Sequence, residues 1–535
     1  MQRSITKART KTKWEKNLTF KPLSNIISIL KENATKYPDK IAIKDKDTSV
    51  TYAELWQQVR GTAAYYHHKN IKAGDRVLVF VPMSVNLYVN MLAIFYIGAT
   101  AVFLDQWSSK KRLNLACKIA ECKAMVGIKK ARLLWFTSSA FRKISVYLDP
   151  KHEMSRRAKS RCDISLEPHP SKKEATALIT FTTGSTGNPK AAKRTHGFLL
   201  EQFDALLNTL HPTEKDIDLI TLPIFVLMNL GVGSTSVIGN FDPRKPASLD
   251  PTHIVDQIKS NACTRIISSP YLLSHVSNYM FHYLKELPSI THIYTGGATV
   301  YPEDCQLFMK AFPNSHGAAI YGSTESEPIS EITFQELAAF DSAVEKNGIC
   351  VGKLYDKINA RIIPVTENNI KVNSTEELEK MFVGNNVIGE IIVSGHHVLT
   401  EYYNSNEAFL KNKIKAGDII WHRTGDAGFI GDDGKLFLTG RCNSLITYKG
   451  KILSPFIYEY LLTRMKEIYC GTVMLVNNKV TLIIEAQGKS DHSFIRQLVK
   501  DSGLLYEDVW FIDHIPMDPR HFSKIDYDKL RKILR

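Results

Sequence analysis

A loop of hydroxyl residues, glycines and one lysine is the part of the sequence best suited to wrapping a phosphate group. It runs from Thr182 to Lys190 with the sequence TTGSTGNPK and follows an apolar strand predicted over residues 177–181. Its glycines let the backbone approach an anion, its hydroxyls donate hydrogen bonds, and its lysine adds a positive charge. The GxxxxGK[ST] spacing of a Walker loop is absent, and a polar turn between a strand and a helix is the simpler alternative.

Further residues of this kind follow in the chain. Tyr321-Gly322-Ser323-Thr324-Glu325 offers a flat ring for a purine, a hydroxyl for phosphate and a carboxylate for a hard cation such as Mg²⁺. Taken alone, Glu325 would most simply be a surface residue. Gly296-Gly297-Ala298 precedes this motif, and His422-Arg423-Thr424-Gly425-Asp426, Gly440-Arg441 and Lys524 follow it.

Taken together and in this order, the motifs closely resemble those of the adenylate-forming superfamily, which includes acyl-CoA synthetases, adenylation domains and luciferases. The resemblance implies that Asp426 accepts hydrogen bonds from both ribose hydroxyls and that Arg441 contacts ribose or phosphate. Ala191 stands where the family usually has glycine. The implied ATP- and AMP-binding residues are Thr183, Gly184, Ser185, Thr186, Gly187, Lys190, Gly297, Ala298, Tyr321, Gly322, Ser323, Thr324, Asp426 and Arg441.

The resemblance also implies a reaction in which a carboxylate attacks the α-phosphorus of ATP. Two anions repel each other, so such a site must supply positive charge and alignment. Lys524 is expected to bridge the carboxylate and the α-phosphate, with Mg²⁺ on Glu325 and the loop beginning at Thr183 stabilising the departing pyrophosphate. A solvated lysine is the ordinary alternative, since Lys529 and Lys532 lie close by in the sequence.

Family members then rotate a C-terminal domain about a hinge, which here corresponds to Asn443. This motion brings a thiol, from CoA or from the phosphopantetheine of an acyl carrier protein, to the acyl-adenylate. Gly450 would leave room for the pantetheine arm. Thr447 stands where many members have lysine, which leaves the second step less firmly predicted than the first.

The segment from Leu222 to Gly233 corresponds to the acyl pocket of the family. It is strongly apolar and offers no carboxylate partner for an α-ammonium group, which favours a fatty acid over an amino acid. Ordinary hydrophobic core is the alternative. The predicted pocket residues are Phe225, Leu227, Met228 and Gly231.

Two other segments resemble bacterial olefin-pathway enzymes that close 3-hydroxy fatty acids into β-lactones. They are FDPRKPA at residues 241–247 and DPRH at residues 518–521, whereas YKGKILSP at residues 448–455 is more like an ordinary ligase. Three functions therefore remain open. They are acyl transfer from the adenylate to CoA or a carrier-protein thiol, β-lactone synthesis, and non-catalytic binding of nucleotide or lipid.

The chain that carries these motifs has α/β patterning from Ile26 to about Gly440. Short apolar strands alternate with helical segments, and glycine turns after Gly389 predict a small β-rich subdomain with a hairpin turn at residues 432–434. The resemblance implies an α/β fold with a large adenylate-forming domain, built from two α/β subdomains and the β-rich one, and a small mobile α+β domain. We divide the chain into a basic tail at 1–20, an AMP-binding domain at 21–440 and a C-terminal lid domain at 441–535.

An uncharged stretch from Val77 to Leu104 is long enough to span a bilayer. Residues that end strands and helices, Pro82 and Gly98, favour a buried βαβ unit instead. Its strands are predicted at 77–81 and 100–104 and its helix from Ser84 to Gly98. Strands of parallel sheets covered on both faces also appear as continuous apolar runs.

Length, charge and cysteine content bear on the number of domains, the partners and the cellular location. The length of 535 residues predicts more than one domain, and the net charge of +15 favours anionic partners without choosing among them. Basic residues are dispersed and match no nucleic-acid module, although the N-terminal tail is compatible with peripheral membrane contact. Eight scattered cysteines without CxxC pairs and the lack of a recognisable signal peptide predict a reducing, cytoplasmic location.

Overall fold

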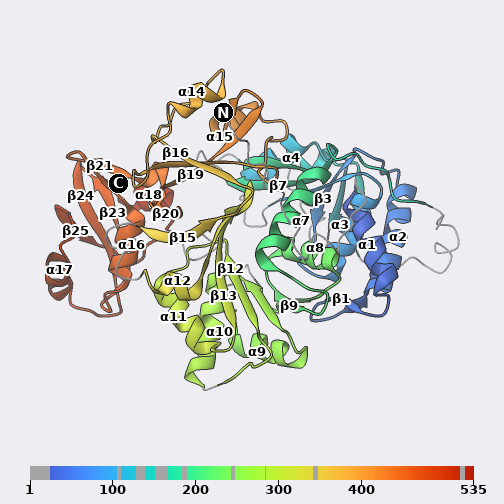
Figure 1. Ribbon diagram of the computed structural model, residues 1–535, viewed down its shortest axis with the longest axis horizontal. Helices are drawn as coiled ribbons and strands as arrows, with labels where there is room; N and C mark the ends of the chain where they lie inside the picture. Colours follow the sequence, from blue (N-terminus) through green and yellow to red (C-terminus); the bar gives the residue numbers. More distant parts are fainter. Residues whose placement is uncertain are drawn as a thin grey trace, which may run out of the picture.

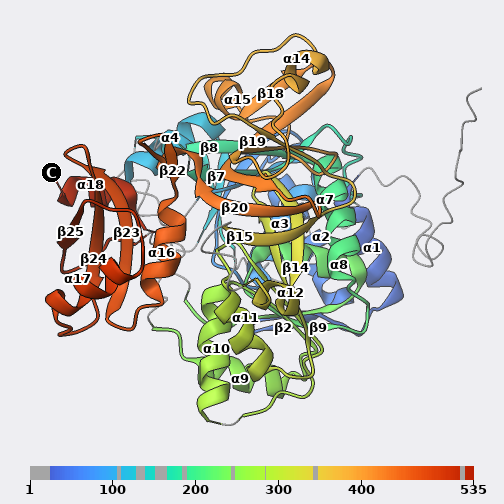
Figure 2. The same ribbon diagram turned by 60° about the vertical axis from the view of Figure 1, so that its left-hand side comes forward.

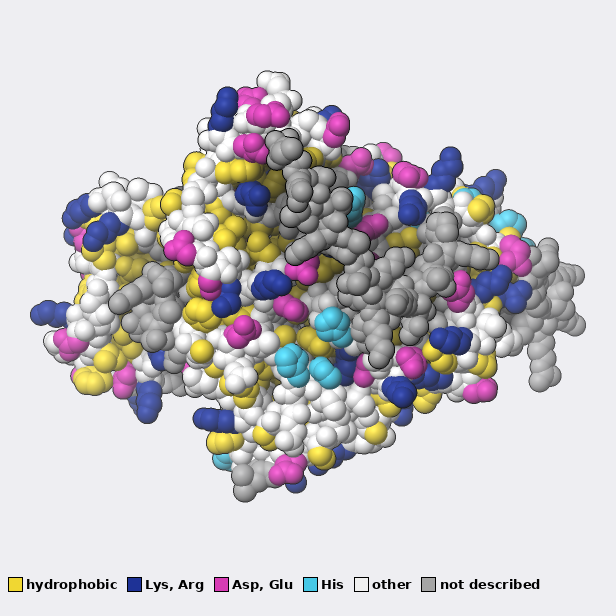
Figure 3. Space-filling view, viewed as in Figure 1, with side chains coloured by type: hydrophobic (Ala, Val, Ile, Leu, Met, Phe, Trp, Pro, Cys, Tyr) yellow, Lys and Arg dark blue, Asp and Glu magenta, His cyan; other side chains and the backbone are white. Residues whose placement is uncertain are grey.

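Two large β-sheets covered by helices form most of the molecule, and a smaller domain follows them at the C-terminal end (Figure 1). The computed structural model describes residues 25–104, 110–127, 139–150, 166–183, 189–242, 248–283, 285–340, 348–517 and 525–534. On the face drawn in Figure 3, lysine and arginine side chains are interspersed with aspartate and glutamate.

The first sheet has six strands in the order β6-β5-β3-β4-β7-β8. All neighbours are parallel except β7 and β8, which form the antiparallel pair around the predicted phosphate loop. The strands are β3 (Arg76–Phe80), β4 (Thr100–Phe103), β5 (Ala124–Gly127), β6 (Val146–Leu148), β7 (Thr176–Thr183) and β8 (Pro189–Thr195). Helices α3 (Val85–Tyr96) and α4 (Lys110–Ala120) connect strands of this sheet.

The uncharged stretch at residues 77–104 is confirmed as a βαβ unit, β3-α3-β4. Ser84 caps α3 by accepting a hydrogen bond from the Leu87 N–H group, and most side chains of the helix are buried among other core residues. Among the residues that the structure describes, no helix is both long enough and apolar enough to cross a membrane.

The second sheet combines a parallel half with an antiparallel half, in the order β16-β17-β19-β20-β15-β14-β13-β12-β11-β9-β10-β1-β2, with β18 paired to β19. The first half comprises β1 (Ile41–Lys44), β2 (Ser49–Thr51), β9 (Ile217–Ile220), β10 (Thr235–Ile238), β11 (Arg265–Ser268), β12 (His292–Gly296) and β13 (His316–Ser323). The second half comprises β14 (Ser326–Thr333), β15 (Ile349–Leu354), β16 (Asn359–Ile363), β17 (Gly389–Ser394), β18 (Lys413–Ala416), β19 (Ile419–Ile430) and β20 (Lys435–Arg441). The predicted hairpin turn at residues 432–434 joins β19 to β20.

Helices cover both sheets and bury their apolar faces against them. α1, α2, α7 and α8 pack with α3 on one large core, while α9 to α12 pack on a second core. Their bounds are α1 (Ile26–Lys36), α2 (Tyr52–His68), α7 (His196–Leu210), α8 (Pro223–Val232), α9 (Pro251–Ser260), α10 (Pro270–His282), α11 (Pro302–Ala311), α12 (Phe334–Ala338), α14 (Thr375–Glu379) and α15 (Asn406–Asn412).

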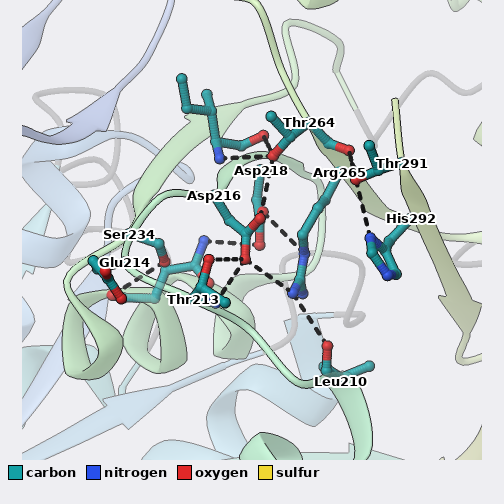
Figure 4. Close-up of polar contacts among 12 residues, drawn as sticks. Leu210, Thr213, Glu214, Asp216, Asp218, Ser234, Thr264, Arg265, Thr291 and His292 are labelled. Carbon is teal, nitrogen blue, oxygen red and sulfur yellow. Dashed lines mark hydrogen bonds and ion pairs between the residues drawn. The ribbon is translucent and has the colours of Figure 1, made fainter. Parts of the chain in front are cut away.

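A buried charged network ties together the amino ends of the parallel strands (Figure 4). Arg265 at the start of β11 contacts Asp216 at 3.5 Å and Asp218 at 3.2 Å, and its Nη1 donates to the Leu210 carbonyl at 3.1 Å. Burial raises the pKa of Asp218 to about 6 although Arg265 opposes the shift. Asn229 of α8 also donates to Asp218, at 3.1 Å, so the network fixes α8 against the sheet. The carboxyl ends of the strands, on the opposite edge, are left for ligands.

The smaller C-terminal domain has its own sheet, β23-β24-β25, and a hairpin, β21-β22. Figure 2 shows it at one side of the molecule with α16 next to the large domain. Its elements are β21 (Ile446–Tyr448), β22 (Lys451–Leu453), α16 (Pro455–Thr463), β23 (Ile468–Val476), β24 (Lys479–Ala486), α17 (His492–Asp501), β25 (Asp508–Phe511) and α18 (Tyr527–Ile533). The division between residues 440 and 441 stays a prediction.

Helix α16 makes several of the contacts between the two domains that the described residues show. Tyr460 stacks on Tyr301 at 5.1 Å between ring centroids and donates to Glu303 at 3.0 Å. Arg464 pairs with Glu303 as well. These polar and aromatic contacts resemble those of interfaces that can rearrange.

Replacing Glu459 of α16 by glutamine is expected to remove a pH dependence of stability. Burial raises the pKa of Glu459 from 4.5 to about 7, although Tyr527 and Thr472 donate to its carboxylate. Between these two values the folded protein holds a proton that the unfolded chain has lost, so stability falls as pH rises. When the pH is raised from about 5 to about 8, the free energy of unfolding of the wild type should fall by about 1–3 kcal/mol more than that of E459Q.

Thermal unfolding at about pH 5 and about pH 8 measures this difference. The variant E467Q is the control, since Glu467 lies outside the hydrogen-bonded group formed by Glu459, Thr472 and Tyr527. Equal losses in the wild type and in E459Q would show that Glu459 is ionised throughout.

Candidate active site

A cleft of about 2000 Å³ lies at the carboxyl ends of the parallel strands, between the two sheets and the C-terminal domain. It brings together motifs that are far apart in the sequence. The sequence-predicted site residues that line it are Lys190, Phe225, Leu227, Gly297, Ala298, Tyr321, Gly322, Ser323, Thr324, Glu325, Asp426, Arg441 and Asn443.

The remaining predicted residues lie elsewhere or outside the described part of the chain. Gly184, Ser185, Thr186, Gly187 and Lys524 fall outside the described residues, and Thr183 is the last residue of β7.

The prediction that Met228 and Gly231 line the acyl pocket is corrected by their positions on α8. Met228 is 2% exposed and packs in the core behind the cleft. Gly231 faces α7, where an added β-carbon would lie 2.5 Å from the ring of Phe203. One face of α8 therefore belongs to the core, and Phe225 and Leu227 are the predicted pocket residues that reach the cleft.

Tyr321, Asp426 and Arg441 form one connected group in the cleft. The Tyr321 hydroxyl donates to Asp426 Oδ2 at 2.7 Å, and Arg441 Nη1 contacts Asp426 Oδ1 at 2.6 Å. The pairing of β19 with β20 places Asp426 opposite Arg441. The charge of Asp426 raises the pKa of Arg441, and burial raises the pKa of Tyr321. This group offers an aromatic ring, a carboxylate and a fixed cation, which suits a nucleoside.

The glycine loop after β12 lies beside this group. Gly297 has a φ of +80° and open space where a side chain would lie, while a β-carbon on Gly296 would fall 2.6 Å from the Ile320 carbonyl oxygen. Both positions therefore favour glycine, and the backbone here is accessible to a flat ligand.

Glu325 lies at the inner end of the cleft and is 6% exposed. The Tyr402 hydroxyl donates to its Oε1 at 3.2 Å. The neighbouring Ser323 hydroxyl is buried and no residue that the structure describes is hydrogen-bonded to it, so it is available to a ligand. One carboxylate suits Mg²⁺, which keeps several waters and takes its other oxygens from phosphates.

Two lysines flank Tyr402, and the sequence analysis identified one of them. Lys190 Nζ lies 5.9 Å from the centroid of the Tyr402 ring and donates to Asn412 Oδ1 at 2.8 Å. Lys413 Nζ lies 5.4 Å from the same centroid and donates to the Leu399 carbonyl. Burial lowers the pKa of Lys190 and lowers the pKa of Lys413 to about 7, with Glu325 opposing the shift in both cases.

Tyr402 belongs to a segment, Val398–Tyr403, that connects the two sheets; we call it the crossing segment. On one side Tyr403 donates through its backbone to Ala191 of β8 at 2.8 Å. On the other side the Leu399 backbone N–H donates to the Glu325 carbonyl at 2.7 Å. The crossing segment is therefore hydrogen-bonded to β8, which follows the predicted phosphate loop, and to the backbone of Glu325.

The sequence analysis missed Tyr402, Asn412 and Lys413. The sequence of β18, KIKA, gave no signal for Lys413, because strand alternation alone would place Lys413 and Lys415 on the same side. The structure separates these two lysines, since Lys413 is buried and Lys415 is exposed. No local pattern distinguishes Tyr402.

The protein has a mixed α/β body with a small α+β domain beside its cleft. This is the architecture of adenylate-forming ligases. The chain belongs to the AMP-binding enzyme family, whose model matches residues 30–403.

Curated relatives and solved structures agree with this assignment. The chain is 29% identical over 444 residues to an olefin β-lactone synthetase of Xanthomonas campestris, with 78% of each chain covered. It is 25% identical to 4-coumarate–CoA ligase 3 of Oryza sativa, covering 91% of this chain and 87% of the relative. The structure of O-succinylbenzoate coenzyme A synthetase from Bacillus subtilis, in complex with AMP, matches the fold with a TM-score of 0.76 at 19% identity, covering 94% of this chain and 98% of that one.

Proposed function

We propose that the protein activates a fatty acid or a hydroxylated fatty acid with ATP, forming an acyl-adenylate and releasing pyrophosphate. The observation that supports this most directly is the meeting of Tyr321, Asp426, Arg441, Glu325 and Lys190 on one cleft. Apolar side chains on the same cleft offer a surface for an alkyl chain; they include Val81, Met83, Leu87, Phe103, Leu104, Phe225 and Leu227.

Each group has a role in this proposal. Tyr321 and the loop at Gly297 hold the adenine, while Asp426, oriented by Arg441, accepts hydrogen bonds from the ribose hydroxyls. Thr324 and Lys190 contact phosphate. Glu325 would hold Mg²⁺, and the ion would supply positive charge opposite the pyrophosphate. Lys524, together with the loop from Thr183, aligns the carboxylate with the α-phosphorus.

The fate of the acyl group has two candidates. Transfer to the thiol of CoA or of a carrier protein is supported by the open space at Gly450, in the turn between β21 and β22, where a side chain would meet no atom within 4 Å. β-Lactone closure is favoured by the olefin β-lactone synthetase relatives, one of which spans 95% of this chain at 26% identity. A non-catalytic binding protein is disfavoured because Lys190, Glu325 and Asp426 are all present on the cleft.

Our proposals for cellular location and partners rest on the sequence. A cytoplasmic location, an acyl carrier protein as partner, peripheral membrane contact through residues 1–20 and the absence of a nucleic-acid partner stay predictions. The N-terminal tail lies outside the described residues. Asn443, which lines the cleft in the turn after β20, stays our proposed hinge.

One experiment tests the reaction and its second step together. The purified protein is incubated with ATP, Mg²⁺ and a panel of fatty and 3-hydroxy fatty acids, with and without CoA, and the products are identified by mass spectrometry. Pyrophosphate release with fatty acids is expected. AMP release that requires CoA would support the thioester, and lactone formation without CoA would support ring closure. A panel on which no acid provokes pyrophosphate release would refute the proposal.

A further inference from the structure

Two side chains of opposite charge, Arg194 and Glu327, line the same cleft as the apolar side chains that we propose for an acyl chain. Arg194 extends from β8 and is 6% exposed, and Glu327 follows Glu325 by two residues on β14. They are close enough for each charge to shift the pKa of the other. Within the described residues no ion pair joins them, and both line the same cleft.

Among the described residues, both side chains have hydrogen-bonding capacity that is not used. Arg194 Nη2 donates to the Thr324 carbonyl at 2.8 Å, but its buried Nε meets no partner within the described part of the chain. Glu327 Oε2 accepts a long hydrogen bond, at 3.4 Å, from Gln202 Nε2. Thr180, diagonal to Arg194 on the same face of the β7-β8 ladder, has a buried hydroxyl that no described residue bonds.

The two opposite charges distinguish between the chemical groups that a substrate could place beside them. A second carboxylate would be repelled by Glu327, and an ammonium group would be repelled by Arg194. A hydroxyl both donates and accepts, so it can donate to Glu327 and accept from Arg194 at the same time. An unsubstituted alkyl chain would leave both charges desolvated and unpaired, which costs free energy.

The position of the pair along the substrate follows from its neighbours. Arg194 is bonded to the backbone of Thr324, and Glu327 lies two residues from Glu325. Both neighbours belong to the motif that we assign to phosphate and metal, where the carboxyl group reacts. The pair therefore lies near the carboxyl end of the acid and far from the end of its alkyl chain.

We propose that Arg194 and Glu327 together recognise a hydroxyl group that the acid carries close to its carboxyl group. This inference rests on the proposed adenylation and defines its substrate class as hydroxylated fatty acids. It assigns specificity to two residues that the nucleotide does not need.

The test compares three acids of equal length: the unsubstituted acid, the 3-hydroxy acid and the acid with its hydroxyl at the far end. The rate of pyrophosphate release gives kcat/KM for each acid with the wild type and with the double variant R194L/E327L. The wild type should prefer the 3-hydroxy acid over the other two by at least about tenfold, because a site built for a hydroxyl rejects an analogue without it. The double variant should lose this preference and retain activity on the unsubstituted acid.

The matched control is K193L/E331L, which removes one positive and one negative charge from the same two strands outside the cleft. It should keep the preference, and circular dichroism with thermal unfolding shows whether each variant is folded. If R194L/E327L does not fold, the single variants R194M and E327Q are measured in the same way.

The results that would contradict this inference differ from those that would contradict the proposed function. Pyrophosphate release by the wild type without a preference among the acids would overturn this inference alone, as would a preference that survives in the folded variants. No release with any acid would overturn the proposed function and this inference with it.

Discussion

Replacing Lys524 by alanine is expected to slow acyl-adenylate formation by about 10²–10³-fold, the effect typical of removing one group that stabilises transition-state charge. The attacking carboxylate and the α-phosphate are both negative, and in our proposal Lys524 is the cation that approaches them from the C-terminal domain. Acid-dependent exchange of pyrophosphate into ATP measures this half-reaction without any acceptor.

The affinity for ATP should change only a few-fold in the same variant, because in our proposal the nucleoside is held by Tyr321, Asp426 and Arg441, which lie on strands of the second sheet. K500A is a suitable control, since Lys500 is an exposed lysine at the end of α17. Full exchange activity in K524A would assign the role to another lysine.

Replacing Glu325 by glutamine is expected to reduce adenylation by about 100-fold and to shift Mg²⁺ activation to higher concentrations. The local charges explain the size of the effect, since Lys190 and Lys413 both lie near Tyr402, which donates to Glu325. Without the carboxylate, the two lysines would repel a divalent cation.

Titration with Mg²⁺ at saturating ATP and acid separates this effect from a structural one. E331Q makes the same chemical change at an exposed position on β14, the strand that follows Glu325, and should leave the titration unchanged. A parallel fall in activity at every Mg²⁺ concentration, without a shift of the midpoint, would contradict the assignment of Glu325 to the metal.

Much of the fold and part of the lining of the cleft could be predicted because local sequence carried the information. The βαβ unit at residues 77–104 has β-branched strands, a helix with a serine cap and a glycine break, and each of these acts within a few residues. The motifs at Gly297 and Tyr321 each combine an unusual residue order with a strand end, whereas Asp426 lies within β19. The structure then brings all three to one cleft.

The residues that were missed depend on contacts between distant segments. Lys413 looks like an ordinary lysine of a surface hairpin, and only the packing of β18 against the crossing segment buries it. The same holds for Arg194 and Glu327, which are separated by more than a hundred residues and line the same cleft from two different sheets. Met228 and Gly231 failed in the opposite way, because an apolar helix shows no difference in sequence between the face toward the core and the face toward the cleft.

The crossing segment sets a limit on how the chain can vary in length. Its backbone is hydrogen-bonded to Ala191 on one side and to Glu325 on the other. An insertion or deletion at residues 398–403 would therefore shift both walls of the cleft out of alignment at once. The exposed turn at Gly417-Asp418, between β18 and β19, has no such double attachment and is the place where inserted residues, such as an epitope or a fluorescent label, should be tolerated.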